Sequence, residues 1–197
     1  MARTIYRPSK DFASRKLRSF ALSSEQVWWK LHLTTRSPVW FSCNPGHRFS
    51  PAGLDVLYLG QSVFTCIMEV FGDELLGGSR TLSLAAWTHR TASRVKLLRP
   101  LAVCNLASPS VRTALGCDLS ALMHTELAVP QAWAKALYDH SAGFHGLRYV
   151  SRFTNLPCLA LFAGRTPVDA FCIEESVPLL EHPDALAFLE AEQIALV

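Results

Sequence analysis

The sequence predicts an α+β fold in which strands cluster along the chain and helices flank them. The chain has 197 residues, 50% of them hydrophobic and 18% charged, so it can bury the core of one domain. Apolar runs of strand length recur between residues 26 and 173, and helical periodicity is confined to a few separate segments. Strands that follow strands favour an α+β arrangement over a regular alternation of strands and helices.

The first half of the chain contains expected strands over Gln26–Thr34, which is rich in Trp and Leu, and over Asp55–Gly60. A helix is expected over Ser62–Phe71, with Ser62 as its N-cap. Three further segments are predicted to be extended: Thr81–Trp87, Arg94–Leu98 and Leu101–Leu106. The Arg99-Pro100 step separates the last two, because a residue before proline disfavours helical geometry.

The second half contains expected helices over Ser110–Leu115 and Pro130–His140, where Pro130 suits a first helical turn. Three short strands complete the expected core: Gly146–Ser151, Cys158–Ala163 and Val168–Ile173. A terminal helix is expected over Pro183–Ala195. The expected organisation is a basic extension over residues 1–25 and a single domain over residues 26–197 that ends in an acidic helix.

Charge is distributed unevenly along the chain, although the net charge is only +3. The first 25 residues carry Arg3, Arg7, Lys10, Arg15, Lys16 and Arg18, whereas no Lys or Arg follows Arg165. The basic segment lacks interleaved aromatic residues, and no helix-turn-helix or zinc-finger pattern is present. A solvated face or a contact with a partner protein is therefore expected there, and no direct binding of nucleic acid.

The remaining composition favours a cytoplasmic protein without a metal. The six cysteines form no C-x-x-C pair and mostly lie in apolar runs, which predicts reduced core residues. No His or Cys spacing is typical of a zinc site. No signal-peptide core follows the N-terminus, and the best apolar run, Leu156–Ala163, is only of strand length, so a soluble protein outside the membrane is expected.

Known nucleotide-binding loops are absent: the chain has neither G-x-G-x-x-G nor G-x-x-x-x-G-K-[ST]. If phosphate is bound, side chains must hold it. Arg48 follows a turn-rich Asn-Pro-Gly-His run, and its planar fork could engage pyrophosphate, although a surface arginine is the alternative. Tyr58 ends an apolar strand and could stack on a cationic ring or serve as a core aromatic. A serine hydrolase is a weak alternative, because no G-x-S-x-G motif is present.

Glu69 lies on the helix expected after that strand. A helical wheel groups Val63, Phe64, Ile67, Val70 and Phe71 on one side and Ser62, Thr65, Cys66 and Glu69 on the other. Glu69 is thus expected to point away from the packed side, with small neighbours that would let a ligand approach. A solvated helix face is the alternative interpretation.

A polar cluster follows the strand in GLRYVSRFTN, and it consists of Ser151, Arg152 and Asn155. Each is also a plausible turn residue. A serine hydroxyl at this place could hold a ribose or carboxamide group.

These segments together resemble the RES family, whose members are NAD-consuming toxins of bacterial toxin–antitoxin pairs. The matching pieces occur in family order: HRFSPAG with Arg48, VLYLGQS with Tyr58, TCIMEVFGD with Glu69, the helix AVPQAWAKALYDH, and LRYVSRF with Ser151. They run from about Trp28 to Phe162. The resemblance implies an ADP-ribosyltransferase-like fold, with a bent or split β-sheet core flanked by helices.

The resemblance also implies cleavage of the nicotinamide–ribose bond of NAD, which is a substrate rather than a cofactor. Glu69 would stabilise the oxocarbenium-like ribose, Arg48 would hold the pyrophosphate, and Tyr58 would contact the nicotinamide. Ser151 would hold a ribose or carboxamide group, and Lys30, Arg152 and Asn155 complete the expected NAD-binding set. Lys30 departs from the aromatic-Arg pair that the family carries on its first strand, so the charge is kept and the planar fork is lost.

Several alternatives stay open at this point. The acceptor could be water in a glycohydrolase, inorganic phosphate in a phosphorylase, or a protein in an ADP-ribosyltransferase, and a non-catalytic interaction module is the third class. The family implies an antitoxin with an Xre-like helix-turn-helix domain as partner. An immunity protein, if the toxin is delivered into rival cells, and a homodimer are the other partner hypotheses.

Overall fold

The computed structural model describes residues 7–78 and 80–197, and its centre is an eight-stranded sheet in the order β1-β6-β7-β8-β3-β2-β5-β9. The strands are β1 (Phe20–Leu22), β2 (Val27–Leu33), β3 (Val56–Gly60), β5 (Arg90–Leu97), β6 (Leu101–Asn105), β7 (Gly146–Val150), β8 (Pro157–Phe162) and β9 (Phe171–Pro178). A small parallel pair is formed by β4 (Thr81–Leu82) and β10 (Ala195–Leu196). The α+β class is therefore confirmed.

The sheet is split between β2 and β3. Those two strands share the single register pair Trp29 and Gly60 among the described residues, whereas β2 pairs with β5 along its whole length. On the other side of the split, β3 pairs with β8 from Val56 to Gly60, and β8 then pairs with β7. The expected bent or split sheet is thus present, and β8 is the strand that joins β3 to β7.

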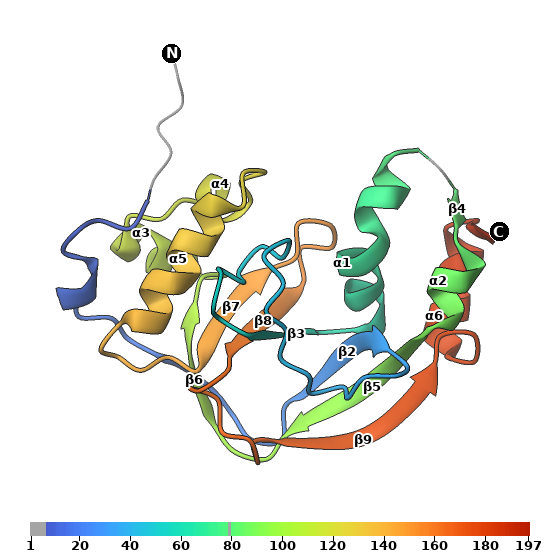
Figure 1. The fold of residues 1–197 in the computed structure, drawn as a ribbon, viewed down its shortest axis with the longest axis horizontal. Coiled ribbons are helices and arrows are strands. Elements are labelled where there is room, and N and C mark those ends of the chain that lie inside the picture. The colour runs from blue at the N-terminus through green and yellow to red at the C-terminus, as the bar shows by residue number, and fades with distance from the viewer. Residues whose placement is uncertain (1–6, 79) are drawn as a thin grey trace.

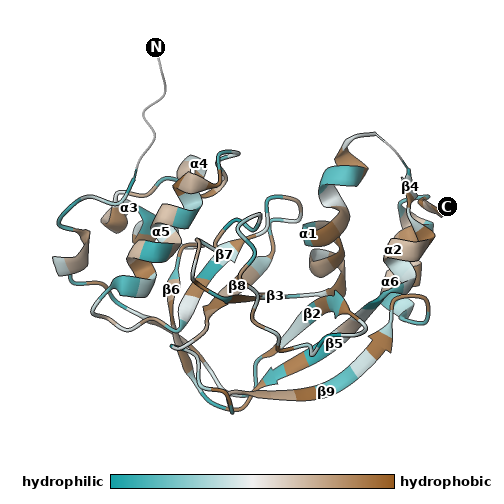
Figure 2. Ribbon diagram, viewed as in Figure 1, coloured by the Kyte–Doolittle hydropathy of each residue, from teal (hydrophilic) through white to brown (hydrophobic). Residues whose placement is uncertain are grey.

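Two groups of helices cover one face of the sheet (Figure 1). The first group is α1 (Val63–Leu76), α2 (Leu84–Thr88) and α6 (Pro183–Ala191), and it packs on β2 and β5. The second group is α3 (Pro109–Leu115), α4 (Leu119–Leu122) and α5 (Ala128–Asp139), and it packs on β6, β7 and β8. In Figure 2 the first turns of α1, nearest the sheet, are mostly hydrophobic, and hydrophilic residues appear further along the helix.

The other face of the sheet curls around its own core. Side chains of consecutive strand residues point to opposite faces, so Leu57, Leu59, Leu159 and Leu161 pack together on that inner face. Alternate residues of the same strands, such as Cys158 and the neighbouring positions of β3 and β7, face the second helical group. Burial on both faces explains why β8 is a continuous apolar run.

The expected helix after β3 is confirmed and extends further, from Val63 to Leu76. The Ser62 hydroxyl caps it by accepting the Thr65 N–H at 3.1 Å. The expected extended segment over residues 81–87 is wrong beyond Leu82. A helix forms there instead, because Ser83 accepts the Ala86 N–H at 3.3 Å and Trp87 is buried against the first helical group.

The strand expected over residues 168–173 lies later in the chain, at Phe171–Pro178. As the edge strand of the sheet, β9 tolerates charged side chains, and Glu174 forms ion pairs with Arg94 and Lys96 of β5. The terminal helix ends at Ala191 rather than Ala195, because the chain turns through Gln193, with φ of 54°, into β10.

The segment before β2 has a structure of its own. The 3-10 helix η1 (Phe12–Ser14) buries Phe12 with its ring centroid 5.5 Å from that of Trp133 on α5, and β1 pairs antiparallel with β6. Residues 7–25 thus contribute both to the sheet and to the core. Arg3, which belongs to the basic stretch expected over residues 1–25, lies outside the described residues.

Candidate active site

A cleft of about 760 Å³ lies over β3, β7 and β8, between the two helical groups. Its floor includes Tyr58, Tyr149 and Cys158, and α1 forms one wall. The loop before β3 and residues 125 and 127 ahead of α5 form the opposite wall, and β2 and β5 close one end. Its size is in the range of small-molecule and cofactor sites.

Glu69 lines this cleft from the second turn of α1. The Tyr149 hydroxyl donates to its Oε2 at 3.5 Å, and the Ser151 hydroxyl forms a second hydrogen bond to the carboxylate. Solvent reaches the side chain through the open cleft, while the protein around it raises the pKa of Glu69 by desolvation. The hydrogen bonds and the charges of Arg48 and Arg152 oppose that shift only in part.

The helical wheel predicted the direction of Glu69 and the burial of Val63, Ile67 and Phe71, but it did not predict the burial of the other residues around Glu69. Thr65 and Cys66 are buried, whereas Phe64 and Val70, expected on the packed side, are 39% and 40% exposed. The reason is that α1 rests on the sheet through Cys66, whose thiol donates to the Trp29 carbonyl at 3.2 Å. On the apolar side of the wheel, Val63, Ile67 and Phe71 are buried in a core shared with α6, and the Phe64 and Phe188 rings lie 5.6 Å apart.

Two glycines allow α1 to come this close. A Cβ atom at Gly60 of β3 would lie 2.8 Å from the Cys66 sulfur, and one at Gly72 of α1 would lie 2.6 Å from the Phe153 ring. Both approaches are shorter than a methyl group permits. The glycines therefore fix the distance of the Glu69 helix from β3 and from the turn that begins at Ser151.

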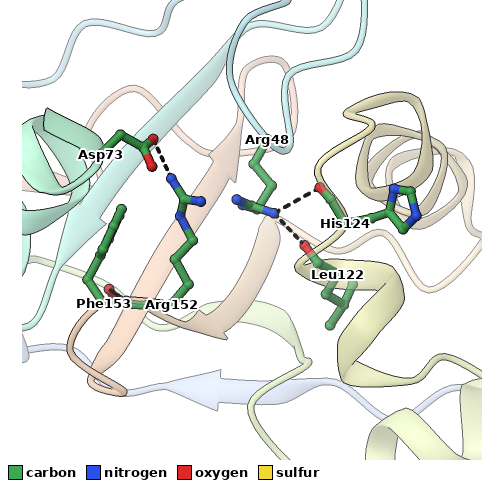
Figure 3. A network of polar contacts seen from close by, with 7 residues as sticks. Arg48, Asp73, Leu122, His124, Arg152 and Phe153 are labelled. Carbon is green, nitrogen blue, oxygen red and sulfur yellow. Dashed lines mark hydrogen bonds and ion pairs between the residues drawn. The ribbon is translucent and has the colours of Figure 1, made fainter. Parts of the chain in front are cut away.

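Arg48 reaches the cleft from the loop between β2 and β3. Its Nη1 donates to the carbonyls of Leu122 at 3.1 Å and His124 at 3.3 Å, which anchors one edge of the guanidinium (Figure 3). Arg152 stands across from it, forms an ion pair with Asp73 of α1 and lies over the Phe153 ring at 4.4 Å. Burial and the nearby Arg152 charge lower the pKa of Arg48. Both guanidinium groups act on the Glu69 carboxylate.

Tyr58 presents its ring to the cleft and its hydroxyl to the protein. The hydroxyl oxygen accepts the Phe49 N–H at 2.9 Å and lies 3.0 Å from the Ser50 hydroxyl. Burial raises its pKa to about 12, so it stays protonated. The ring packs edge-on against His47, with centroids 5.5 Å apart. With the hydroxyl engaged by the protein, the ring is the part of Tyr58 that is left to contact a ligand in the cleft.

Tyr58→Phe is expected to lower the free energy of unfolding by about 1–3 kcal/mol, because it leaves the Phe49 N–H without its acceptor. Urea denaturation followed by circular dichroism measures the change. Tyr138→Phe, which removes a hydroxyl from a partly buried tyrosine on α5, is the matched control. Equal stabilities for the two variants would contradict the assignment.

Ser151 does not line the cleft, since it is fully buried beneath it. Its Oγ accepts the N–H groups of Phe153 at 3.2 Å and Thr154 at 3.3 Å and bonds to Glu69. It is therefore placed to orient the carboxylate. Asn155 is exposed, outside the cleft lining, and adopts a φ of 56° as it closes the turn by donating its N–H to the Ser151 carbonyl.

Lys30 lines the cleft from β2, and desolvation lowers its pKa to about 8. Several cleft residues were not predicted from the sequence, namely Tyr149, Asp73, Phe153, Arg90 and His47. A signal existed for two of them. Asp73 lies four residues after Glu69 on the same helical face, and Tyr149 is two residues before Ser151, on the same side of the strand.

A known protein family and known solved structures resemble this chain in sequence or in fold. The model of the family described as RES domain matches residues 27–181. The crystal structure of the M. tuberculosis MbcT-MbcA toxin-antitoxin complex contains a similar chain, with a TM-score of 0.68 at 18% sequence identity; the match covers 87% of this chain and 92% of that chain. At this identity, the likeness shows the fold. A comparison with curated proteins gives no match.

Two further observations concern only residues 7–78 and 80–197. No helix there is long and apolar enough to cross a membrane. No group of three or more His, Cys, Asp or Glu side chains there could hold a metal ion.

Proposed function

This chain belongs to the RES domain family, and on that premise we propose that it is a toxin enzyme that cleaves the nicotinamide–ribose bond of NAD. The observation that carries the proposal is the carboxylate of Glu69, which lines the cleft under the influence of two arginine side chains, whereas the carboxylate of Asp73, which also lines it, is paired with Arg152. A dinucleotide needs cations for its pyrophosphate, and its labile bond needs negative charge at the ribose.

The chemistry requires few groups. Nicotinamide leaves NAD as a neutral ring from a cationic one, so no strong general acid is needed, unlike ordinary glycoside hydrolysis with its two carboxylates. In the proposed reaction, Glu69 stabilises the positive charge that develops on the ribose. Tyr149 and Ser151 hold the carboxylate, Arg48 and Arg152 bind the pyrophosphate, and the Tyr58 ring contacts the nicotinamide.

The group that accepts the ADP-ribose, whether water, inorganic phosphate or a protein, decides which reaction takes place. Purified protein is incubated with NAD, with and without inorganic phosphate, and nicotinamide release is followed by chromatography, with Glu69→Ala as the blank. Free ADP-ribose identifies a glycohydrolase, and a phosphorylated ADP-ribose identifies a phosphorylase. Labelled NAD that marks a protein identifies an ADP-ribosyltransferase. Folded protein that releases no more nicotinamide than Glu69→Ala would overturn the proposal in favour of a non-catalytic module.

The proposal includes a neutralising partner. The similar solved chain comes from a toxin-antitoxin complex, and we infer that a cognate antitoxin, with an Xre-like helix-turn-helix domain, covers the cleft of this chain in the cytoplasm. Co-expression with the product of an adjacent gene should yield a complex that releases no nicotinamide. A bound partner that leaves nicotinamide release unchanged would contradict the inference that the partner covers the cleft. Inhibition by a protein without a helix-turn-helix domain would indicate an immunity protein.

Arg48→Lys is expected to lower kcat/KM for NAD by about 10–100-fold. Lysine keeps the charge but cannot donate to Leu122 and His124 while also presenting a planar fork to phosphate, and a charge-assisted hydrogen bond contributes about 1.5–3 kcal/mol. Steady-state kinetics of nicotinamide release measure it. Arg165→Lys is the matched control, because Arg165 also donates to a backbone carbonyl, that of Tyr138, but outside the cleft. An equal loss in both variants would contradict the assignment.

A further inference from the structure

Trp40 is an aromatic residue that stays in contact with solvent inside the candidate active-site cleft. It lines the cleft and is 53% exposed. The other four tryptophans are half-buried or buried: Trp28, Trp29, Trp87 and Trp133. Folding usually buries the large apolar surface of an aromatic ring, so a ring that lines a cleft and remains exposed indicates a surface that a ligand can cover.

The loop between β2 and β3 fixes the backbone on both sides of Trp40. The Trp40 N–H donates to the Ser37 carbonyl at 3.1 Å, which closes a turn. Two residues after Trp40, Ser42 forms an antiparallel bridge with Val56 of β3, and each of the two bridged residues donates its N–H to the carbonyl of the other at 3.1 Å. The backbone therefore presents the ring in a defined position, which lowers the entropic cost of binding a ligand.

The side chains along this loop alternate between the core and the cleft. Val39 and Phe41 pack against the core on the inner face of the sheet, and Trp40 between them lines the cleft. Because the bridge is antiparallel, Trp40, two residues before it, lies toward the same end of β3 as Tyr58, two residues after Val56. Trp40 and Tyr58 thus line the same cleft from two bridged segments of the chain.

An arginine accompanies the Trp40 ring. The guanidinium carbon of Arg36 lies over the ring, 5.9 Å from its centroid, and Arg36 also lines the cleft. Arg36 forms no ion pair with a carboxylate among the described residues. Aromatic rings on which bases stack, together with arginine cations, are the groups with which proteins bind nucleobases of any kind. The two side chains therefore offer a ring for a base and a cation for a nearby phosphate.

We propose that Trp40, with Arg36 over its ring, forms a stacking platform for the purine base of a nucleotide in the cleft. NAD carries two flat rings, and the proposed function places the nicotinamide against Tyr58 and leaves the adenine without a partner. The indole of Trp40 is the exposed ring on which that base stacks. This inference deepens the proposed function and rests on it only for the identity of the nucleotide.

Two ligands that contain no nicotinamide–ribose bond test the platform on the whole protein. ADP carries the purine base, whereas inorganic pyrophosphate carries only the phosphates. Each is titrated by calorimetry into wild type and into Trp40→Ala, Trp40→Phe and Phe20→Ala. Phe20→Ala is the matched control, because Phe20 is also an exposed aromatic residue with an arginine, Arg148, over its ring at 5.5 Å, but it lies on β1 outside the cleft.

Trp40→Ala is expected to weaken ADP binding about tenfold or more, the usual range for losing one stacked base, and to leave pyrophosphate binding within about twofold of wild type. Trp40→Phe should restore ADP binding to within about threefold, because a smaller ring still stacks. ADP should also quench the tryptophan fluorescence of wild type but not of Trp40→Phe, since Trp40 is the exposed tryptophan. In NAD turnover, Trp40→Ala should raise KM about tenfold and change kcat less than about twofold.

The platform is overturned if ADP does not bind, if folded Trp40→Ala binds ADP as wild type does, or if that variant weakens pyrophosphate binding as much as ADP binding. An equal loss of ADP binding in Phe20→Ala would overturn it as well. Neither titration involves cleavage of NAD. A protein that binds ADP through Trp40 but releases no nicotinamide would therefore contradict the proposed function and retain the nucleobase site.

Discussion

Glu69→Gln is expected to lower kcat for nicotinamide release by about 10²–10³-fold, the typical cost of removing one electrostatic contact to a transition state. Glutamine keeps the shape and can still accept the hydrogen bonds from Tyr149 and Ser151, but it brings no negative charge to the ribose. The KM for NAD should change much less, because the pyrophosphate contacts of the ground state remain. Initial rates at saturating NAD measure the effect.

Because the pKa of Glu69 is raised, the reaction rate and the stability of the fold should depend on pH in opposite directions. The wild-type rate should fall as pH drops through the raised pKa, because only the carboxylate is active. Stability should behave the other way: a carboxyl group whose pKa is higher in the folded state favours folding at low pH and disfavours it as pH rises through that pKa. Glu69→Gln should therefore be more stable than wild type at pH 7, and this advantage should disappear in acid.

Glu74→Gln is the matched control, since Glu74 lies on the same helix but is exposed and outside the cleft. It should leave the rate, the pH profile and the stability unchanged. Full activity in Glu69→Gln, or an equal loss in both variants, would remove Glu69 from the mechanism.

Gly72→Ala is expected to reduce both stability and activity. Overpacking usually costs about 1–3 kcal/mol, whereas alanine gains about 1 kcal/mol over glycine within a helix. Because the new methyl group would meet three ring atoms of Phe153 at 2.6 to 2.8 Å, the clash should exceed the gain. Displacement of Phe153 moves Arg152, which lies over its ring, and the turn at Ser151 that holds Glu69. A fall in kcat/KM of about tenfold is expected, since small misplacements have large kinetic effects.

The effect of Gly72→Ala on stability should reverse its sign in a variant that already lacks the Phe153 ring. With Phe153→Ala already present, the space is free, so Gly72→Ala should stabilise the protein by up to about 1 kcal/mol through helix propensity. Gly77→Ala is a control in which an alanine adopts the helical conformation already present and meets only its own helix. Urea denaturation of the four proteins of the cycle measures the coupling. Destabilisation by Gly72→Ala in both backgrounds would show that Phe153 is not the obstacle.

Much of the fold follows from local sequence patterns. Helix α1, with its Ser62 cap, and the strand β8, buried on both faces, were predictable because the cap residue and the apolar run are local signals. The 81–87 segment was not, because Trp87 joins a core that also takes residues from α1 and α6. The displaced β9 was missed since an exposed edge strand carries no hydrophobic alternation to read.

Like the fold, the candidate site contains residues that the sequence predicts and others that it does not. Arg48, Tyr58 and Glu69 line one cleft, as the sequence led us to expect, and their roles in NAD binding stay predictions. The support beneath them could not be predicted, because Ser151, Tyr149 and Asp73 act through contacts between strands and helices far apart in the chain. Arg90 could not be predicted for the same reason: only the pairing of β5 with β2, in which Arg90 lies opposite Leu33, brings it to the cleft.

The position of β8 has a consequence for when a newly synthesised chain can become active. Tyr58 belongs to β3 and Tyr149 to β7, and the strand that holds β3 and β7 together is made after both. A nascent chain shorter than 162 residues lacks part of that strand, so the two sides of the cleft floor have no shared neighbour. The site depends on pairing between strands that are far apart in the chain, and such pairing forms late in folding. Fragments that end before residue 162 should therefore lack the assembled site, and a neutralising partner is needed only once β8 has been made.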